Sequence, residues 1–508
     1  MDVHSEKSGG LSPEAVEQCI RTLESILEDR VQLATIPEDM RHALIMAAGR
    51  VSRPDKLEIM KLSKLHRRQK KKKHDAADRK AVAETAIRAA RRAEVFQNPV
   101  ALPPSMGARP KLNRPRNCYV CKKEYDTLHF FYDSMCAECG DLNFAKRSQT
   151  ASLEGTIALL TGGRIKIGYQ CALMLLRAGA RVIVTTRFPR DAVQRFAKEA
   201  DYGNWKDRLE LHGLDLRHSP SVDAFCEYLI ERLPRLDFLI NNAAQTVRRP
   251  PGFYRHLLDL EAAPLTTLPP VWRKPLEAYE SFKTPRLHTG IESDWVADLS
   301  TKGAAIGIQA AGLLTQIPLL KGDSDPDHEH FPEGKRDADL QQIDLRTMNS
   351  WRMKLADVPT PELIEVQLVN SIAPFILCSK LKSVMLKNKY PYKHVVNVSA
   401  MEGKFTRYTK TDRHPHTNMA KAALNMMTLT SAPDYAKDGI YMNAVDTGWV
   451  TDEDPAQHSE RKQLEHDFQP PLDIVDGAAR VCDPIFSHVL SGEGVWGKFL
   501  KDFAPTSW

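Results

Sequence analysis

The fold is decided between residues 156 and 168, where the chain reads TIALLTGGRIKIG. Residues 156–160 form an apolar run with the length of a buried strand, and a glycine-rich turn follows it directly. Residues 169–178 then have the composition of a helix. Further apolar runs of the kind that forms buried strands occur at 181–185, 236–240 and 394–398. Strands that alternate with helices predict an α/β fold with a doubly wound parallel sheet.

The glycine-rich turn is suited to hold a phosphate group. A turn between a first strand and a helix lets a phosphate approach backbone N–H groups at the helix N-terminus, where the helix dipole favours negative charge. We therefore expect phosphate binding at this turn. The candidate residues are Thr161, Gly162, Gly163, Lys166, Ile167 and Gly168.

The composition is typical of folded, soluble protein. The 508 residues are 42% hydrophobic and 27% charged, which excludes a wholly disordered chain. No run approaches the roughly 18 uninterrupted apolar residues of a membrane-spanning helix. Residues 1–6 also lack the basic and apolar regions of a secretory signal. We expect a cytoplasmic protein with no membrane contact, and the basic run at 64–74 adds nuclear import as an alternative.

The positive charge is concentrated in one segment. Lys56 to Arg92 holds 14 Lys and Arg against 4 Asp and Glu, a charge of +10 in a chain whose total is +6. The alanine-rich composition of this segment favours a long, solvent-exposed helix. Weak electrostatic contact with nucleic acid or an acidic protein through residues 56–92 is one interpretation, and a merely solvated helix is the other. The segment lacks interleaved aromatic residues, which disfavours base-specific recognition.

Four of the nine cysteines form a metal-ligand pattern, with the spacing Cys118-x2-Cys121-x14-Cys136-x2-Cys139. Each CxxC pair can place two thiolates on one ion, and two such pairs complete a tetrahedron, which suits Zn2+. Because four sulfur ligands leave no open position, we expect a structural site and not a catalytic one. Four free thiols or a redox pair are the alternatives.

These patterns predict four parts of the chain. A helical, basic N-terminal region covers 1–97, and a proline-rich linker covers 98–115. A small four-cysteine zinc module covers 116–150, and the α/β domain covers 151–508. The α/β domain carries an insertion at about 246–345, which leaves the end of a strand beside the expected ligand cleft. We expect this insertion to be a substrate lid or an interaction platform.

Five motifs, in the right order, resemble those of the short-chain dehydrogenase/reductase family, whose domain is a Rossmann fold. The turn at 161–168 resembles the family's TGxxxGxG, and Asn241-Asn242-Ala243-Ala244 resembles its NNAG. The other matching stretches are 369–375 with the family's catalytic asparagine, the strand motif at 396–400, and 443–448, which resembles NAVxPG. The resemblance extends from about Leu153 to the C-terminus and implies a nicotinamide dinucleotide cofactor and an oxidoreductase activity.

The resemblance also implies a catalytic tetrad, and this chain departs from it. Asn370 and Lys421 match the family's asparagine and lysine, whereas the tyrosine position holds Thr417. The serine position holds Ala400, with Ser399 one place earlier. A threonine hydroxyl is far less acidic than a tyrosine and is a poor general acid. The candidates for a replacement donor in the preceding loop are Tyr408, His414 and His416.

The resemblance further implies the residues that hold the cofactor. Arg187 follows the second strand, with Arg190 close by, and an arginine there accommodates the 2′-phosphate of NADP(H). NAD remains the alternative if Arg187 only faces solvent. Lys166 replaces the family's second glycine, where its side chain either pairs with the pyrophosphate or blocks it. The other implied positions are Asp215, Asn242, Ala243, Lys421 and Gly448.

Two functions are therefore open at this point. The first is an NADP(H)-dependent oxidoreductase with rebuilt acid–base groups, acting on a carbonyl or alcohol that the sequence does not identify. The second is a catalytically degenerate nucleotide-binding scaffold or sensor, in other words a pseudoenzyme. A homo-oligomer is compatible with both.

Overall fold

The computed structural model describes residues 11–96, 109–283, 306–324, 329–406 and 410–508. The chain divides into two compact units, Met1–Ala76 and Ala77–Trp508. This division falls inside the region 1–97 that the sequence groups together. The reason is that Val82 and Ile87 are buried in the hydrophobic core around the cysteine module.

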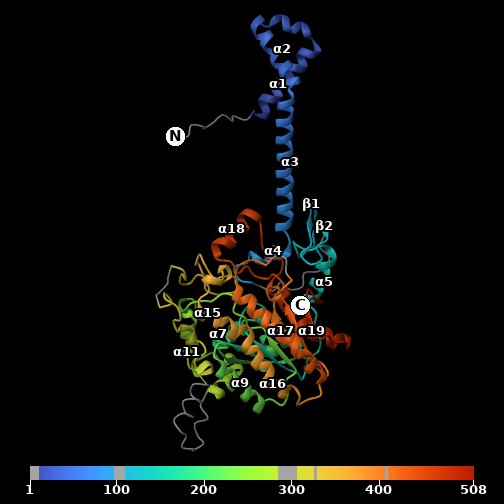
Figure 1. Cartoon of the computed structure of the whole chain (residues 1–508). Helices are drawn as coiled ribbons and strands as arrows, with labels where there is room; N and C mark the ends of the chain where they lie inside the picture. Colours follow the sequence, from blue (N-terminus) through green and yellow to red (C-terminus); the bar gives the residue numbers. More distant parts are fainter. Residues whose placement is uncertain (1–10, 97–108, 284–305, 325–328, 407–409) are drawn as a thin grey trace, which may run out of the picture. The chain divides into compact units, whose positions relative to one another are not determined.

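The first unit is helical and buries little apolar surface. Its elements are α1 Pro13–Glu28, the 3-10 helix η1 Arg30–Thr35, α2 Glu38–Ser52 and the first part of α3 Lys56–Ala83 (Figure 1). The Ser12 hydroxyl accepts a hydrogen bond from Ala15 N at 3.1 Å, and Pro13 begins the helix, as expected from their capping preferences. No described residue before Ala77 is buried, so the described part of this unit has no hydrophobic core of its own.

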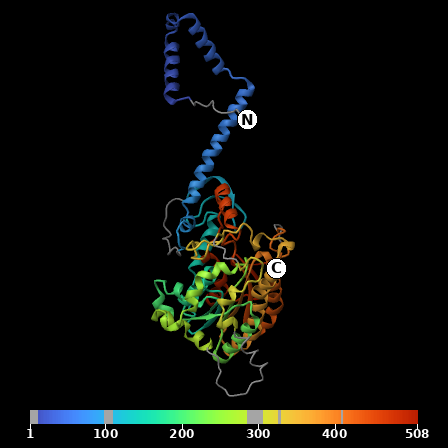
Figure 2. The same cartoon turned by 90° about the vertical axis from the view of Figure 1, so that its left-hand side faces the viewer.

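An eight-stranded sheet is the centre of the second unit (Figures 1 and 2). The strands are β3 Ile157–Thr161, β4 Arg181–Thr186, β5 Leu209–Gly213, β6 Phe238–Asn241, β7 Lys393–Ser399, β8 Ile440–Asp446, β9 Phe499–Lys501 and β10 Ala504–Thr506. Their spatial order is β10-β9-β8-β7-β6-β3-β4-β5, and only the β9–β10 pair is antiparallel. The strand order reverses between β3 and β6, which confirms the predicted doubly wound sheet.

Two hydrophobic layers cover the two faces of this sheet. Ala158 and Leu160 of β3 belong to one layer, and Ile157 and Leu159 belong to the other, because successive side chains of a strand point to opposite faces. The helices of the first layer are α6 Lys166–Arg177, α7 Pro189–Phe196 and α19 Ile474–Ser491. The helices of the second are α9 Ser219–Arg232, α16 Ala373–Met385 and α17 Pro415–Lys437. Shorter elements are α8 Tyr202–Trp205, η2 Lys206–Arg208, η10 Met401–Gly403 and α18 Ala456–His466.

The cysteine module is a small antiparallel sheet followed by a helix. Its elements are β1 Lys111–Asn117, β2 Glu124–Thr127 and α5 Ala137–Arg147. β1 begins inside the segment 98–115 that the sequence indicated as a linker, because Lys111 pairs with Thr127 of β2. Residues 97–108 of that segment lie outside the described part.

The basic segment 56–92 is less exposed than predicted. The expected long helix ends at Ala83, and a separate helix, α4 Ala86–Arg91, follows it. Ile87 and Arg88 are buried, and the Arg88 guanidinium donates to the Asp133 carboxylate. Arg91 donates to the Leu472 carbonyl at 2.7 Å. Arg88 and Arg91 therefore satisfy groups inside the second unit.

The insertion after β6 is a chain of short helical elements. They are α10 Pro251–Tyr254, η3 Arg255–Leu257, α11 Leu258–Ala262, η4 Leu265–Thr267, α12 Pro270–Arg273, η5 Lys274–Leu276, α13 Glu277–Lys283, η6 Leu313–Gln316, η7 Ser350–Arg352 and η8 Leu355–Asp357. Tyr279 lies over Gly213 at the end of β5, where a Cβ atom would stand 2.2 Å from the tyrosine hydroxyl oxygen. That hydroxyl donates to the Ile308 carbonyl at 2.7 Å. The insertion thus packs at the carboxyl edge of the sheet.

One helical stretch, Thr360–Met385, is long and apolar enough to cross a membrane by composition. It consists of α15 Thr360–Gln367, the π-helical turn η9 Leu368–Ile372 and α16. Half of an 18-residue window within this stretch is buried, and α16 packs against α9. Such burial is typical of a core helix in a folded domain.

Candidate cofactor cavity and metal centre

A large cavity lies at the carboxyl ends of the parallel strands, with a volume of about 1110 Å3. Its wall includes residues that directly follow β3, β4, β5, β6, β7 and β8. It contains every predicted cofactor residue except Thr161 and Gly163, and it also contains Ser399 of the predicted catalytic set. The carboxyl edge at a reversal of strand order is where open α/β sheets bind ligands.

The glycine turn is shaped by close backbone packing. A Cβ atom at Gly168 would lie 2.3 Å from the Gly162 carbonyl oxygen and 2.4 Å from Asn242 Nδ2, so only glycine fits there. At Gly163 a Cβ atom would lie 2.6 Å from Val184, which explains why this residue packs on β4 and does not line the cavity. The Thr161 hydroxyl accepts a hydrogen bond from Ala243 N at 3.0 Å and so joins the turn to β6.

Lys166 keeps the backbone shape of the glycine that it replaces. Its φ is 53°, in the left-handed region that favours glycine, and α6 begins at this residue, three positions before the predicted start. The side chain lines the cavity with its Nζ atom 4.0 Å from Glu453 Oε1. Burial opposes its charge, but the carboxylates of Glu453 and Asp339 outweigh burial and raise the pKa of Lys166. The lysine is thus a charged group in the cavity wall.

Arg187 is held at the end of β4 by the insertion. Its guanidinium donates to the Tyr254 hydroxyl at 2.7 Å and lies over the Tyr254 ring, 4.6 Å from the ring centre. Arg187 lines the cavity, whereas Arg190 does not. Arg190 is instead buried, and it donates to the Glu261 carbonyl and to the Glu280 carboxylate. Only Arg187 of the two is placed to meet a ligand.

The polar residues after β5 and β6 are fixed by internal bonds. Burial raises the pKa of Asp215, but hydrogen bonds and charge from Arg217, 2.6 Å away, outweigh it and hold that pKa below its usual range. Arg217 also pairs with Glu365 at 2.6 Å. The Asn242 side chain donates to the carbonyls of Thr161 and Gly162 at 3.0 and 3.1 Å. These bonds preorganise the wall around the glycine turn.

Lys421, in the N-terminal part of α17, and Ser399, the last residue of β7, lie in the cavity wall. Lys421 Nζ donates to the Val398 carbonyl at 2.8 Å, and burial lowers the pKa of the lysine to about 8. Ser399 is buried, and its hydroxyl donates to Asn425 Oδ1 at 2.6 Å. Ala400 lines the cavity beside them and offers no hydroxyl.

Asn370 and Thr417 do not line the cavity. Asn370 lies in the π-helical turn η9, where its side chain accepts from Gln245 N at 2.7 Å and donates to the Gln245 carbonyl at 3.0 Å. It therefore positions the chain that leaves β6 for the insertion. Thr417 is buried, and its hydroxyl has no hydrogen-bond partner among the described residues. The residue after it, Asn418, does line the cavity.

Of the three suggested replacement donors, only His414 lines the cavity within the described residues. It is the N-cap residue of α17, with a φ of 41°, and its ring stacks on Trp351 at 3.9 Å between ring centres. Burial lowers the pKa of His414, so the imidazole is neutral near neutral pH. His416 lies elsewhere, 3.5 Å from Glu362, and Tyr408 lies outside the described part.

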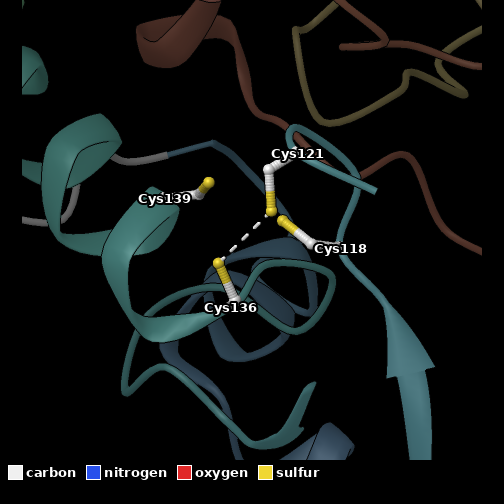
Figure 3. Close-up of side chains that lie close together, drawn as sticks. All are labelled: Cys118, Cys121, Cys136 and Cys139. Atoms are coloured by element: carbon white, nitrogen blue, oxygen red, sulfur yellow. Dashed lines mark hydrogen bonds between the residues drawn. The ribbon is translucent and has the colours of Figure 1, made fainter. Parts of the chain in front are cut away.

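The four predicted metal ligands come together. The ligand atoms of Cys118, Cys121, Cys136 and Cys139 all lie within 4.8 Å of one another, and the Cys121–Cys136 sulfur separation is 3.8 Å (Figure 3). Zn–S bonds of about 2.3 Å in a tetrahedron place neighbouring sulfur atoms about 3.8 Å apart. Figure 3 shows Cys118 and Cys121 in the loop after β1, and Cys136 and Cys139 at the start of α5. The cluster has the geometry to hold a metal ion.

Sequence reasoning missed that the cysteine module reaches the cavity. Tyr119, which follows Cys118, and Lys122, which follows Cys121, both line it. Lys501 of β9 also lines it and pairs with Asp446 at 2.8 Å. No motif marks these three residues, because their contacts join segments far apart in the sequence.

Comparison with known proteins agrees with this geometry. The family model described as short chain dehydrogenase matches residues 156–256, and the one described as Enoyl-(Acyl carrier protein) reductase matches 347–471. The two matches are separated by residues 257–346, which make up most of the insertion, and they contain the glycine turn and Lys421. The chain belongs to the short-chain dehydrogenase/reductase family. The resemblance found in the sequence motifs is thereby confirmed.

The similar proteins differ in how much of this chain they match. An uncharacterized protein of Acanthamoeba polyphaga mimivirus is 30% identical over 398 residues, 76% of this chain and 74% of that protein. Dehydrogenase/reductase SDR family member 13 of Bos taurus is 39% identical over 94 residues, but the match covers only 18% of this chain and 24% of the bovine protein. An NADPH-bound carbonyl reductase from chicken fatty liver aligns structurally with a TM-score of 0.41 and 17% identity, over 70% of this chain and 100% of the other.

Proposed function

We propose that the protein is an NADP(H)-binding oxidoreductase of the short-chain dehydrogenase/reductase family. The observation that carries this proposal is the cavity at the carboxyl edge of the sheet, whose wall holds the glycine turn, Arg187 and Lys421 together. The family is one of oxidoreductases, and the choice of NADP(H) over NAD(H) follows from Arg187 at the end of β4.

The charge of the cavity supports a polyanionic ligand. Several cations in its wall make no ion pair with a carboxylate among the described residues, namely Lys122, Arg187, Lys404, Arg413 and Lys421. Lys404 is only 8% exposed, and its amine donates to the Ser507 hydroxyl. Burial of an unpaired cation is unfavourable, and an anionic ligand would remove that cost. The phosphates of NADP(H) would supply such charges.

Different residues of the chain would bind different parts of the cofactor. The turn at Gly162–Gly168 would face the pyrophosphate, and Arg187 would bind the 2′-phosphate. Lys421 would bind the ribose next to the nicotinamide, as its position in the family implies. The bound dinucleotide would supply a hydride, or accept one, and the substrate would be a carbonyl compound or an alcohol. Among the described residues, His414 is the suggested proton donor that borders the same space.

A structural Zn2+ in the four cysteines completes the proposal. Four sulfur ligands satisfy a tetrahedral ion and leave no position for substrate, so the ion would stabilise the module and take no part in the reaction.

A nucleotide-binding scaffold without turnover is the second candidate. The observation that favours it is the absence of the usual hydroxyls from the cavity wall: position 400 is alanine, and Thr417 is buried outside the wall. General acid–base catalysis typically contributes about 100- to 10,000-fold to a rate, so the loss of those groups can abolish a measurable reaction.

Cofactor titration tests the shared part of both candidates. NADPH, NADP+, NADH and NAD+ are titrated into the full chain by isothermal calorimetry, and the unfolding temperature is followed in parallel. We expect micromolar or tighter binding of NADPH, at least tenfold weaker binding of NADH, and a higher unfolding temperature with NADPH. No heat and no stabilisation with any of the four would overturn both candidates.

NADPH oxidation with a panel of aldehydes and ketones then separates the two. Turnover that disappears in Lys421→Met would favour the enzyme. Tight NADPH binding without turnover across the panel would favour the scaffold.

A further inference from the structure

The cysteine module forms part of the wall of the cavity. Tyr119 follows the first metal ligand directly, Lys122 follows the second, and both line the cavity. They belong to the loop that Figure 3 shows carrying Cys118 and Cys121. A structural metal site would therefore lie one residue away from a side chain that borders the ligand space.

The Tyr119 hydroxyl lies beside the residues that follow β8. Trp449 N donates to it at 2.9 Å, so the oxygen accepts one hydrogen bond. The hydroxyl's own proton has no acceptor among the described residues. A Cβ atom at Gly448 would stand 3.2 Å from the same oxygen, so the glycine leaves room for the phenol. The proton is available to a ligand that reaches Gly448.

The body of the module is fixed to the α/β domain by buried ion pairs. Arg147 at the end of α5 pairs with Asp473 at 2.7 Å and with Asp476 at 2.8 Å. The Tyr132 hydroxyl donates to Asp476 at 2.5 Å, and Arg480 donates to Asn143 at 2.6 Å. α5 therefore provides a rigid platform on α19.

The loop that carries Tyr119 has fewer ties to this platform. Tyr119 N donates to the Ser134 carbonyl at 2.8 Å, and two backbone bonds, from Cys118 N to the Lys123 carbonyl and from Lys122 N to the Cys118 carbonyl, close the loop on itself. The cysteine cluster links this loop to α5, because Cys118 and Cys121 face Cys136 and Cys139. A bound ion would clamp the Tyr119 loop to the fixed part of the module.

We propose that Tyr119 is a ligand-binding residue of the cavity, whose hydroxyl donates a hydrogen bond to the bound dinucleotide at the Gly448 end, and that the metal in the cysteine cluster holds it in that position. This inference rests on the proposed NADP(H) site. It assigns the metal module a role in the binding of the cofactor, in addition to its own stability.

The first test is Tyr119→Phe, which removes the hydroxyl and keeps the ring. We expect the variant to retain one zinc per chain and an unchanged unfolding temperature without ligand, and to bind NADPH about tenfold more weakly in calorimetry. Tyr228→Phe is the matched control, because Tyr228 donates to the Ala278 carbonyl at 3.3 Å away from the cavity. NADPH affinity within twofold of the control would overturn the inference.

The second test asks whether the metal acts through Tyr119. Zinc is removed by a chelator from the wild type and from Tyr119→Phe, and metal content, circular dichroism and NADPH affinity are measured. We expect metal removal to weaken NADPH binding about tenfold in the wild type and less than threefold in Tyr119→Phe, with the α/β signal retained in both. Equal losses in the two proteins would show that the metal acts elsewhere.

The outcomes also distinguish this inference from the function on which it rests. A wild-type chain that binds none of the four dinucleotides overturns both. A wild type that binds NADPH, together with a Tyr119→Phe variant that binds it equally well, overturns only the role of Tyr119.

Discussion

The two ends of the cavity match the family motifs to different degrees. At the end formed by β3, β4 and β6, Gly162, Gly168, Arg187 and Asn242 line the cavity. At the end formed by β7 and β8, position 400 has no hydroxyl and Thr417 lies outside the wall. Tyr119 enters that second end from a separate module.

The difference shows what each task requires. Binding a dinucleotide depends on backbone shape and on charge, and a turn keeps its shape as long as its close contacts persist. Proton transfer depends on particular groups with matched pKa values, and one substitution removes such a group. A chain can therefore retain the first end while it rebuilds the second.

The largest effect is expected from Gly168→Ala, at the end of the cavity formed by β3, β4 and β6. The new Cβ atom would stand 2.3 Å from the Gly162 carbonyl oxygen, so the turn must move. We expect NADPH affinity to fall about 100-fold and the free energy of unfolding to fall by about 1–3 kcal/mol, measured by calorimetry and urea unfolding. Gly203→Ala is the control, because nothing lies within 4 Å of its Cβ position. Unchanged binding in Gly168→Ala would show that the ligand does not use the turn.

Arg187→Ala should have the next largest effect. A charge-assisted hydrogen bond contributes about 1.5–3 kcal/mol, so NADPH binding should weaken about 10- to 100-fold while NADH binding stays the same. The matched control is Arg461→Ala, whose side chain is 66% exposed on α18. Equal losses of affinity for NADPH and NADH would show that Arg187 does not bind the 2′-phosphate. Such a result would favour NAD(H) as the cofactor.

A rise in pH should have a smaller effect on NADPH affinity, through the charge of Lys421. Burial lowers the pKa of Lys421 to about 8, so the cavity loses a positive charge as pH rises through 8. We expect NADPH affinity to fall about three- to tenfold between pH 7 and 9.5, and Lys421→Met to flatten that dependence. The contribution of Lys421 to folding stability has the opposite sign. Above pH 8 the unfolded state binds more protons at this lysine than the folded state, so the contribution rises with pH up to the ordinary pKa near 10.4.

The smallest effect should come from restoring the family's hydroxyls in Ala400→Ser with Thr417→Tyr. Because residue 417 does not line the cavity, a tyrosine ring there must first displace its buried surroundings. We expect NADPH oxidation with the carbonyl panel to rise less than about tenfold, and NADPH affinity to stay within threefold. A 100-fold rise in NADPH oxidation would mean that the side chains at positions 400 and 417 alone account for the missing chemistry at the β7–β8 end.

Local patterns predicted the parts of the molecule that depend on local structure. The strand and turn at 156–168 and the spacing of the four cysteines were sufficient, because each feature is formed by neighbours in the sequence. The break between α3 and α4 was missed, because burial of Ile87 against the cysteine module decides it. Thr417 was expected in the site from its spacing to Lys421, but the register of α17 turns Asn418 toward the cavity instead.

The helices before Ala77 have a consequence for how the chain opens. None of their described residues is buried, so their backbone hydrogen bonds are protected by little more than the helices themselves. Amide protons there should exchange with solvent within seconds, whereas those of β3 and β7, buried along their whole length, should persist for hours or longer. A brief protease treatment should accordingly trim the chain toward Ala77 and leave the α/β domain intact.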